Sequence, residues 1–371
     1  MSFEFEKALE SVAAVAAQNA AAADRGEFPQ ATIDALRAAG LLGLVSATSV
    51  GGQGQGLAQA AAVVERLARE CASTAMIVCM HYAGTAVIEQ HGPEDVRKAI
   101  AAGKHLTTLA FSEPGSRSQF WASLNTATAD GNDVRITGKK SFVTSAHKAD
   151  SYVWSSKPVS GSELSTLWLV PRTTQGLRVD GAFDGLGLRG NDSAPVTAEG
   201  VKLPQSARLG ADGAGFGIMM GAVLPWFNVM SANVSAGIME SLVERSVKHV
   251  AGTTFEHASS TLAELPTVRA FIARMRIKTD QTKGLNFDTL AAIGGNRADA
   301  TLRVLECKAA AGEAATEVGD LAMRVCGGAA FRKDVGVERA FRDARAAVVM
   351  APTTDALYDF IGKAVCGLPL F

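Results

Sequence analysis

Residues 122–146 read ASLNTATADGNDVRITGKKSFVTSA, two runs of alternating Thr, Ala, Val and Ile on either side of the turn sequence DGND. Alternating runs that flank a Gly-containing turn are typical of a β-hairpin. Further runs rich in Val, Thr, Ser and Trp, namely DSYVWSS, STLWLVP and APVTAEGVKL, extend this pattern over about residues 106–205. The middle of the chain is therefore predicted to be a small all-β module.

Helical periodicity precedes and follows this module. Before it, Ala-rich apolar repeats spaced three and four residues apart run from residue 5 to about residue 104, with a helix expected to begin at Pro93. After it, broad apolar stripes predict a four-helix bundle from the runs at about 218–251, 267–294, 299–325 and 337–365. The order predicts an α+β protein with an N-terminal helical domain (1–105), a middle β-barrel-like module (106–209) and a C-terminal four-helix bundle (210–371).

The composition limits the classes of partner. Lys and Arg number 36 and Asp and Glu 37, so the chain has no excess of positive charge for holding a nucleic acid. No run of about 18 uninterrupted apolar residues occurs, and the acidic start MSFEFEKALE is unlike a secretion signal. The five cysteines lack CxxC spacing, which favours reduced, packed thiols over disulfides or a metal site. We expect a soluble cytoplasmic protein that forms a homodimer or homotetramer through its Ala- and Gly-rich bundle.

Three short motifs offer groups to a ligand. LAFSEPGSRSQF (109–120) gathers hydroxyl and backbone N–H groups around a Pro-Gly turn, which suits a polar ring edge or a phosphate. TGKKSFVTSA (137–146) places an aromatic ring beside small and hydroxyl-bearing residues. CGGAAFRKDVGVERAFRDAR (326–345) has a Gly pair after a helix, where a ligand or another backbone can approach closely. Each motif alone is equally well explained by a solvated loop, a core aromatic or a salt-bridged helix surface.

In this order and spacing, the three motifs closely resemble the acyl-CoA dehydrogenase superfamily, and FPQATIDALRAAGLLGLVSATSVGGQGQGLAQAAAVVERLA resembles its N-terminal helical domain. Members of the superfamily hold FAD between the β module and the bundle, so the resemblance implies the acyl-CoA dehydrogenase fold with FAD as cofactor. Within it, Phe142 would contact the isoalloxazine, and Gly327 and Gly328 would admit the adenosine half of a neighbouring subunit's FAD. The full set of implied cofactor contacts is Leu109, Phe111, Ser112, Ser118, Phe142, Val143, Thr144, Phe255, Gly327, Gly328, Thr353 and Asp355.

The chain departs from the family at the catalytic base. Aligned without a gap on E-R-x-x-R-D-A-K-x-x-x-I-Y-E-G-T, ERAFRDARAAVVMAPTTDAL puts Ala351 where the family's Glu removes the α-proton of a fatty acyl thioester. Some relatives carry the base on the first bundle helix instead, but Phe227 and Asn228 occupy that position. His81 and Asp355 are weak candidates for a base, and His81 is as well explained by a structural role.

The substrate contacts implied by the resemblance are also unusual. Arg117 stands where the family has Gly, which places a cation near the thioester or the cofactor phosphates. Trp226 and Phe227 are expected to line an apolar substrate pocket.

Three functions stay open. The first is FAD-dependent α,β-dehydrogenation of an acyl thioester such as a CoA thioester, with the usual base missing and an electron-transfer flavoprotein as acceptor. The second is a flavin-dependent monooxygenase, which takes reduced FAD or FMN from a flavin reductase, uses oxygen and needs no α-proton base; the apolar strip AAVVMAP suits its water-poor pocket. The third is a non-catalytic flavoprotein relative.

Overall fold

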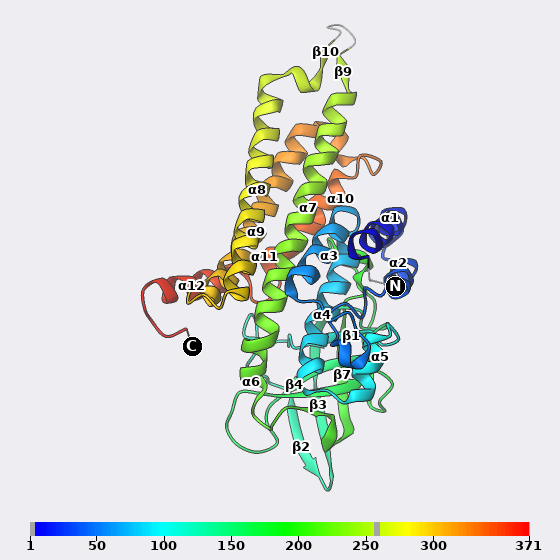
Figure 1. The fold of residues 1–371 in the computed structure, drawn as a ribbon, viewed down its shortest axis with the longest axis vertical. Coiled ribbons are helices and arrows are strands. Elements are labelled where there is room, and N and C mark those ends of the chain that lie inside the picture. The colour runs from blue at the N-terminus through cyan, green and yellow to red at the C-terminus, as the bar shows by residue number, and fades with distance from the viewer. Residues whose placement is uncertain (1–3, 256–259, 371) are drawn as a thin grey trace. The chain divides into compact units, whose positions relative to one another are not determined.

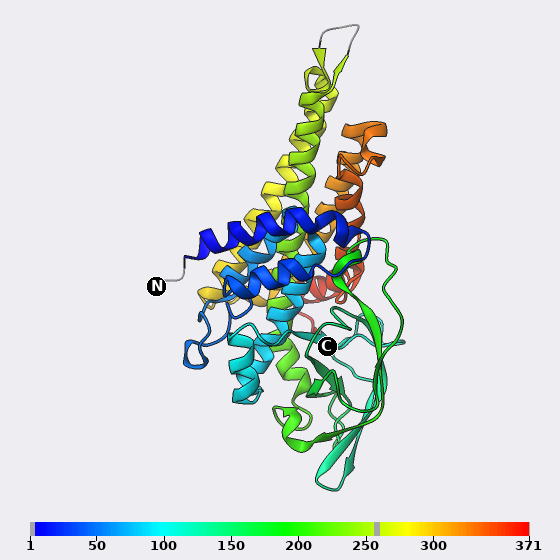
Figure 2. The same ribbon diagram turned by 90° about the vertical axis from the view of Figure 1, so that its right-hand side faces the viewer.

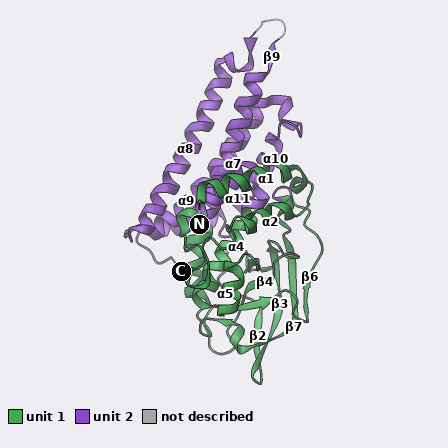
Figure 3. Cartoon of the chain, turned by 45° about the vertical axis from the view of Figure 1, so that its right-hand side comes forward, with its two compact units in different colours: residues 1–60, 76–185, 189–227 green, residues 61–75, 186–188, 228–371 purple. Residues whose placement is uncertain are grey.

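The computed structural model describes residues 4–255 and 260–370, and the chain divides into two compact units (Figure 3). Unit 1 comprises Met1–Ala60, Met76–Gly185 and Arg189–Phe227. Unit 2 comprises Ala61–Ala75, Leu186–Leu188 and Asn228–Phe371. The strands of the middle module belong to unit 1, and the long C-terminal helices belong almost entirely to unit 2.

The N-terminal region is helical, as the periodicity predicts. Its helices are α1 (Phe5–Asp24), α2 (Gln30–Ala38), α3 (Leu57–Glu70), α4 (Ala72–His91) and α5 (Glu94–Ala101). Helix α5 begins directly after Pro93 and carries Glu94 and Asp95 in its first turn, where acidic side chains interact favourably with the helix dipole. Most of α4 is buried, and this helix carries His81.

The β module, whose strands are cyan to green in Figure 2, consists of two open four-stranded sheets and not of the barrel-like module that the sequence suggested. The strand orders are β1-β4-β5-β8 and β2-β3-β7-β6, so in the described part of the chain each sheet keeps two edge strands instead of closing on itself. The strands are β1 (Thr107–Ala110), β2 (Thr126–Asp130), β3 (Asp133–Val143), β4 (Ser151–Ser156), β5 (Thr166–Pro171), β6 (Leu177–Val179), β7 (Ala194–Pro204) and β8 (Arg208–Leu209).

The predicted hairpin is confirmed. Strands β2 and β3 pair in antiparallel register with Asp130 opposite Asp133, which leaves Gly131 and Asn132 as a two-residue turn. Strands of both sheets contribute to one buried core, in which Trp154 and Trp168 are fully buried. This core anchors the strand ends that carry the second of the three motifs.

The C-terminal helices form the bundle of unit 2 (Figure 1). The long helices are α7 (Leu224–Gly252), α8 (Pro266–Gly294) and α9 (Ala300–Cys326). Helix α7 follows α6 (Gly215–Ile218) and a π-helical turn (Met219–Val223). The short strands β9 (Thr254–Phe255) and β10 (Ser260–Thr261) come between α7 and α8 in the chain. By length and composition alone, Gly215–Gly252 could cross a membrane, but 56% of its most apolar window is buried inside the structure. We interpret it as a core helix.

The fourth long helix expected over residues 337–365 is broken into three. Its pieces are α10 (Val337–Ala344), α11 (Ala346–Val349) and α12 (Thr354–Val365). Pro352 has no N–H and cannot continue a helix, and Thr353 starts a new one by accepting a hydrogen bond from the N–H of Ala356 through its side chain. The segment that contains Ala351 is therefore irregular and lies between α11 and α12.

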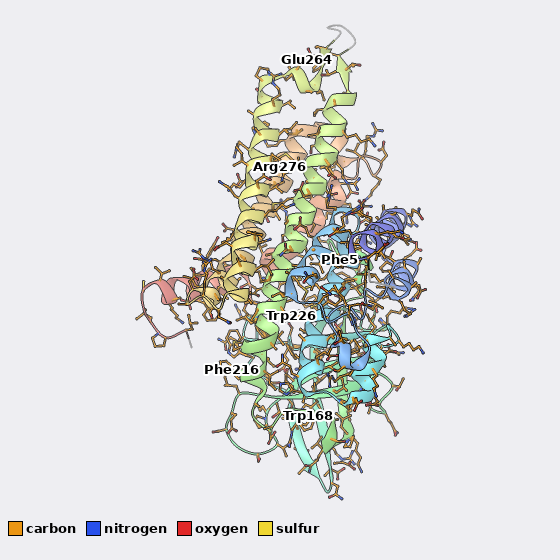
Figure 4. The ribbon with its side chains drawn as sticks, in the orientation of Figure 1. Phe5, Trp168, Phe216, Trp226, Glu264 and Arg276 are labelled. Carbon is orange, nitrogen blue, oxygen red and sulfur yellow. The ribbon has the colours of Figure 1, made fainter. Side chains whose placement is uncertain are left out.

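Ion pairs join the helices of unit 2. Glu240 of α7 accepts two hydrogen bonds from Arg276 of α8, at 2.8 and 2.9 Å, and Arg276 is labelled on α8 in Figure 4. Lys283 of α8 lies 2.8 Å from Glu65 of α3 and 3.2 Å from Glu240. Bidentate pairs of this kind fix helix register as well as adding stability.

Candidate functional site

The β module presents Phe142 at a strained strand end. Strand β3 shifts its register with β7 between Lys140 and Val143, and Phe142 has a φ of +51°. Non-Gly residues in this left-handed region cost about 1–3 kcal/mol and concentrate at functional sites. The phenyl ring is 75% exposed, whereas Lys140 and Val143 are buried. The irregularity therefore turns one aromatic ring outward from an otherwise buried strand end.

The segment after β1 lies against the same strand end. The N–H of Ser141 donates to the carbonyl oxygen of Ser112 at 2.8 Å, which brings together two motifs that the sequence separates by about 30 residues. Leu109 and Phe111 are buried beside this junction, and Ser118 is half-buried in the loop that follows. This is the arrangement that a planar ligand with polar edges would require from the β module.

The neighbours of Phe142 in the predicted contact set point elsewhere. The side chain of Val143 belongs to the core of the β module. Thr144 is buried, with its hydroxyl 3.4 Å from the hydroxyl of Ser193. Among these three residues, only Phe142 has an exposed side chain.

A buried ion pair holds the loop that follows Ser112. The ammonium of Lys140 lies 2.5 Å from Oε1 of Glu113, and their side chains are 0% and 1% exposed. Glu113 also accepts from the hydroxyl of Ser123 and the N–H of Leu124, each at 2.6 Å. Burial lowers the pKa of Lys140 to about 8, while the adjacent Glu113 opposes that shift. The pair therefore clamps both ends of the loop that carries Ser118.

The predicted substrate residues of unit 1 have different settings. Arg117 is exposed and has a φ of +50°, a strained conformation that Gly would adopt freely. Trp226 is half-buried near the start of α7, and Phe227 is buried. Figure 4 labels Trp226 on this helix. None of the three can act as a general base.

Both ring nitrogens of His81 have hydrogen-bond partners in the backbone. One ring nitrogen, Nε2, lies 3.0 Å from the carbonyl oxygen of Leu42, and the other, Nδ1, accepts from the N–H of Thr107 at 3.2 Å. Burial lowers the pKa of His81 to about 4. A neutral imidazole that donates at one nitrogen and accepts at the other satisfies both bonds, which is a structural arrangement.

The position predicted for the family's base carries no ionisable group. Ala351 lies in the irregular segment between α11 and α12, and no titratable side chain occurs from Ala346 to Thr353. Thr353 caps α12, and Asp355 is exposed in its first turn. Asn228 on α7 uses its amide to donate to the carbonyl oxygen of Val304 at 3.1 Å.

The Gly pair after α9 is accessible within unit 2. Gly327 ends α9 with a φ of +55°, and a Cβ added to Gly327 or Gly328 would meet no atom within 4 Å. The backbone at this point is open to close approach by another molecule. Phe255, also in the predicted contact set, is half-buried in β9.

The charged residues of α10 have structural partners. Asp343 accepts from the N–H of Leu188 at 2.6 Å, and Arg342 donates to the carbonyl oxygen of Leu186 at 3.0 Å. Arg342 also donates to Glu338, one turn earlier, at 2.7 Å. These hydrogen bonds hold residues 186–188 against α10.

Two lysines, Lys140 and Lys308, are buried although the sequence did not predict it. Lysine is usually solvated, so neither was expected in a core. For Lys308 a signal existed: it lies four residues after Val304 and three before Ala311, on the apolar stripe of α9 whose neighbours are buried. For Lys140 the alternation of β3 places it on the same face as Val134 and Ile136, which are buried.

Comparisons with known proteins agree in the family they indicate. Models of the N-terminal, middle and C-terminal domains of acyl-CoA dehydrogenase match residues 4–103, 108–201 and 213–366. The mitochondrial short-chain specific acyl-CoA dehydrogenase of Homo sapiens is 27% identical over 338 residues, which cover 88% of this chain and 80% of that protein.

Solved structures share the fold. Butyryl-CoA dehydrogenase from Megasphaera elsdenii aligns with a TM-score of 0.90 at 20% identity and covers 99% of both chains. PigA, in a structure described as its FAD complex, aligns with a TM-score of 0.88 at 19% identity and covers 99% of this chain and 98% of that one.

Proposed function

Because this chain belongs to the acyl-CoA dehydrogenase family, whose three domains match it in order, we propose that it is an FAD-dependent oxidoreductase acting on an acyl thioester. The observation that carries the flavin assignment is the outward-turned Phe142, held at a strained strand end beside Ser112. The proposed reaction is α,β-dehydrogenation, or a close variant of it, without the usual base.

The residues present fit FAD. Phe142 offers an aromatic face for the isoalloxazine, and Ser112 and Ser118 supply polar groups near its edge and the phosphates. Gly327 and Gly328 leave the backbone bare, as a neighbouring subunit's adenosine half requires. When bound, FAD supplies a two-electron acceptor for the hydride that leaves the β-carbon of the substrate.

The chain's own residues decide where the α-proton can go. The methyl group of Ala351 cannot accept a proton, and neither can the ring of Phe227 or the amide of Asn228. His81 is buried and bonded at both nitrogens, which leaves the exposed Asp355 as the remaining candidate. A placed general base contributes about 10²–10⁴ in rate. We therefore infer slow turnover of ordinary acyl thioesters, or a substrate whose α-proton is already acidic.

A second candidate function is a flavin-dependent monooxygenase. The observation that favours it is the complete lack of titratable side chains over residues 346–353, because oxygen chemistry needs an apolar, water-poor site and no α-proton base. Such an enzyme would receive reduced FAD or FMN from a flavin reductase. The dehydrogenase would instead pass its electrons to an electron-transfer flavoprotein.

We further propose that the protein is a cytoplasmic homodimer or homotetramer. Helix α8 exposes the apolar side chains of Ile277 and Phe287. Large exposed apolar groups on one element are typical of surfaces that another subunit covers. Sedimentation velocity of the purified protein distinguishes these states from a monomer.

Flavin binding is the first test. The purified protein is titrated with FAD and with FMN, each oxidised and reduced, and the change in flavin absorbance is followed. Phe142→Ala should weaken the binding, whereas Leu164→Ala, which removes an exposed apolar side chain elsewhere in unit 1, should not. If no form of flavin binds to the wild type, both enzymatic proposals fail.

Reaction with substrate separates the two enzyme classes. The FAD-loaded protein is mixed anaerobically with a panel of acyl-CoA thioesters, and bleaching of the flavin absorbance supports dehydrogenation. Oxygen uptake by the reduced protein, coupled to an oxygenated product and without bleaching by any thioester, supports the monooxygenase instead.

A further inference from the structure

Lys308 is a buried cation on α9 that faces the segment between α11 and α12. The residue is 1% exposed, and its ammonium donates to the carbonyl oxygens of Pro352 at 2.7 Å, Met350 at 3.0 Å and Ala347 at 3.4 Å. Burying an ammonium is costly unless its donors are bonded. Three bonds to one short segment offset that cost, and all these residues belong to unit 2.

These bonds determine the path of the backbone on both sides of residue 351. The last carbonyls of a helix have no partner within it, and Lys308 supplies one for Ala347 and Met350 at the end of α11. The C=O and N–H of a trans peptide point in opposite directions. Because the carbonyl of Met350 points at Lys308, the amide N–H of Ala351 points away from α9.

Helix α9 also approaches the same segment closely one turn later. Gly312 lies four residues after Lys308 and so on the same face of the helix. A Cβ at Gly312 would lie 3.3 Å from the hydroxyl of Thr354 and 3.4 Å from a methyl carbon of Val348. The segment is therefore hydrogen-bonded to Lys308 at one turn of α9 and packs against the backbone at Gly312 one turn later.

We propose that Lys308 is a positioning residue for the reaction, holding residues 347–352 against α9 and so setting where residue 351 meets the substrate. The proposal rests on the proposed function, since it treats this segment as part of the reaction site. Lysine suits the task because its compact ammonium carries three donors for three converging carbonyls. The planar fork of arginine cannot reach all three in the same way.

Hydrogen exchange followed by mass spectrometry tests the holding role without any substrate. In Lys308→Met, exchange in a peptide covering 346–353 should quicken by about 10-fold or more, the factor expected for one lost hydrogen bond to a charged group. Peptides from α8 should be unchanged. Lys278→Met is the matched control, because this lysine lies on α8 and pairs at the surface with Glu317.

Two exchange results would overturn the proposal: no change over 346–353, or an equal rise throughout α8 and α9. If Lys308→Met does not fold, Lys308→Arg decides by the same criterion. It keeps the charge and should give a smaller rise that is still confined to 346–353. In that variant, an unchanged exchange rate over 346–353, or an equal rise throughout α8 and α9, counts against the proposal.

A kinetic readout tests the positioning role. In the FAD-loaded Ala351→Glu protein, adding Lys308→Met should slow flavin bleaching at saturating thioester by about 10–100-fold, since small misplacements of a reacting group have effects of this size. The dissociation constant for FAD should not change. An unaltered bleaching rate would contradict the proposal. If Ala351→Glu itself is not bleached by any thioester, the proposed function fails, while the exchange result still decides the role of Lys308.

Discussion

Replacing Lys140 by Met removes the cation of the buried ion pair between Lys140 and Glu113 and leaves the carboxylate of Glu113 in place. Glu113 is then a buried acid whose side chain is 1% exposed and whose ion-pair partner is gone. Removing one member of a buried pair costs about 3–5 kcal/mol. Glu113 keeps its bonds from Ser123 and from the N–H of Leu124, so we expect the lower end, about 3 kcal/mol.

Urea denaturation followed by tryptophan fluorescence measures this cost. All four tryptophans belong to unit 1, and the ammonium of Lys140 lies 5.1 Å from the ring centroid of Trp154. With a slope of about 2 kcal/mol per molar urea, the loss should lower the midpoint by about 1.5 M. FAD affinity should fall as well, because the loop carrying Ser118 loses its clamp.

Two controls make the result decisive. Lys139→Met changes the exposed neighbour on the same strand and should cost less than about 0.5 kcal/mol. The double variant Glu113→Gln with Lys140→Met removes the stranded charge and should recover part of the stability. The reasoning is refuted if Lys140→Met is as stable as Lys139→Met, or if the double variant is no more stable than Lys140→Met.

Three further predictions concern other parts of the molecule. His81→Phe leaves a buried carbonyl and a buried N–H unpartnered, so unit 1 should lose about 2–4 kcal/mol of stability in urea denaturation. Because burial lowers the pKa of His81 to about 4, the wild type should lose stability as the pH falls from about 6.5 to 4. The variant should not show this loss. The ion pair with Arg276 lowers the pKa of Glu240 to about 2, so its stabilisation is complete above about pH 4.5 and is lost towards pH 2; Glu240→Gln should flatten this acid dependence, and an unchanged profile would argue against the pair. Phe142→Gly should relieve about 1 kcal/mol of backbone strain yet weaken FAD binding by about 3–10-fold, whereas a joint fall in stability and no change in FAD binding would contradict the role of the ring.

Local chemistry explains what could be predicted from the sequence. The hairpin follows from a Gly-containing turn between alternating runs, and the start of α5 follows from a Pro before two acids. The order of helices, strands and helices follows from the change in hydrophobic period. The proximity of Ser112 to the strand end at Phe142 could be expected only from the family resemblance, because nothing local joins them.

Features that depend on residues far away in the sequence could not be predicted from local patterns. The break at Pro352 was overlooked because the apolar stripe on both sides is continuous enough to suggest one helix. The burial of Lys308 depends on carbonyls about 40 residues away, and that of Lys140 on a carboxylate 27 residues away. The open sheets were mistaken for a barrel because alternation along a strand does not reveal whether its sheet closes.

The central claim is that this protein keeps the flavin site of its family but lacks the base at residue 351. Anaerobic rapid mixing of FAD-loaded wild type and Ala351→Glu with the same acyl-CoA tests it directly, with Val349→Glu as a control for adding a carboxylate at an exposed place nearby. We predict that Ala351→Glu bleaches its flavin about 10²–10⁴-fold faster than the wild type, and that Val349→Glu does not. A wild type that bleaches as fast as Ala351→Glu would contradict the claim.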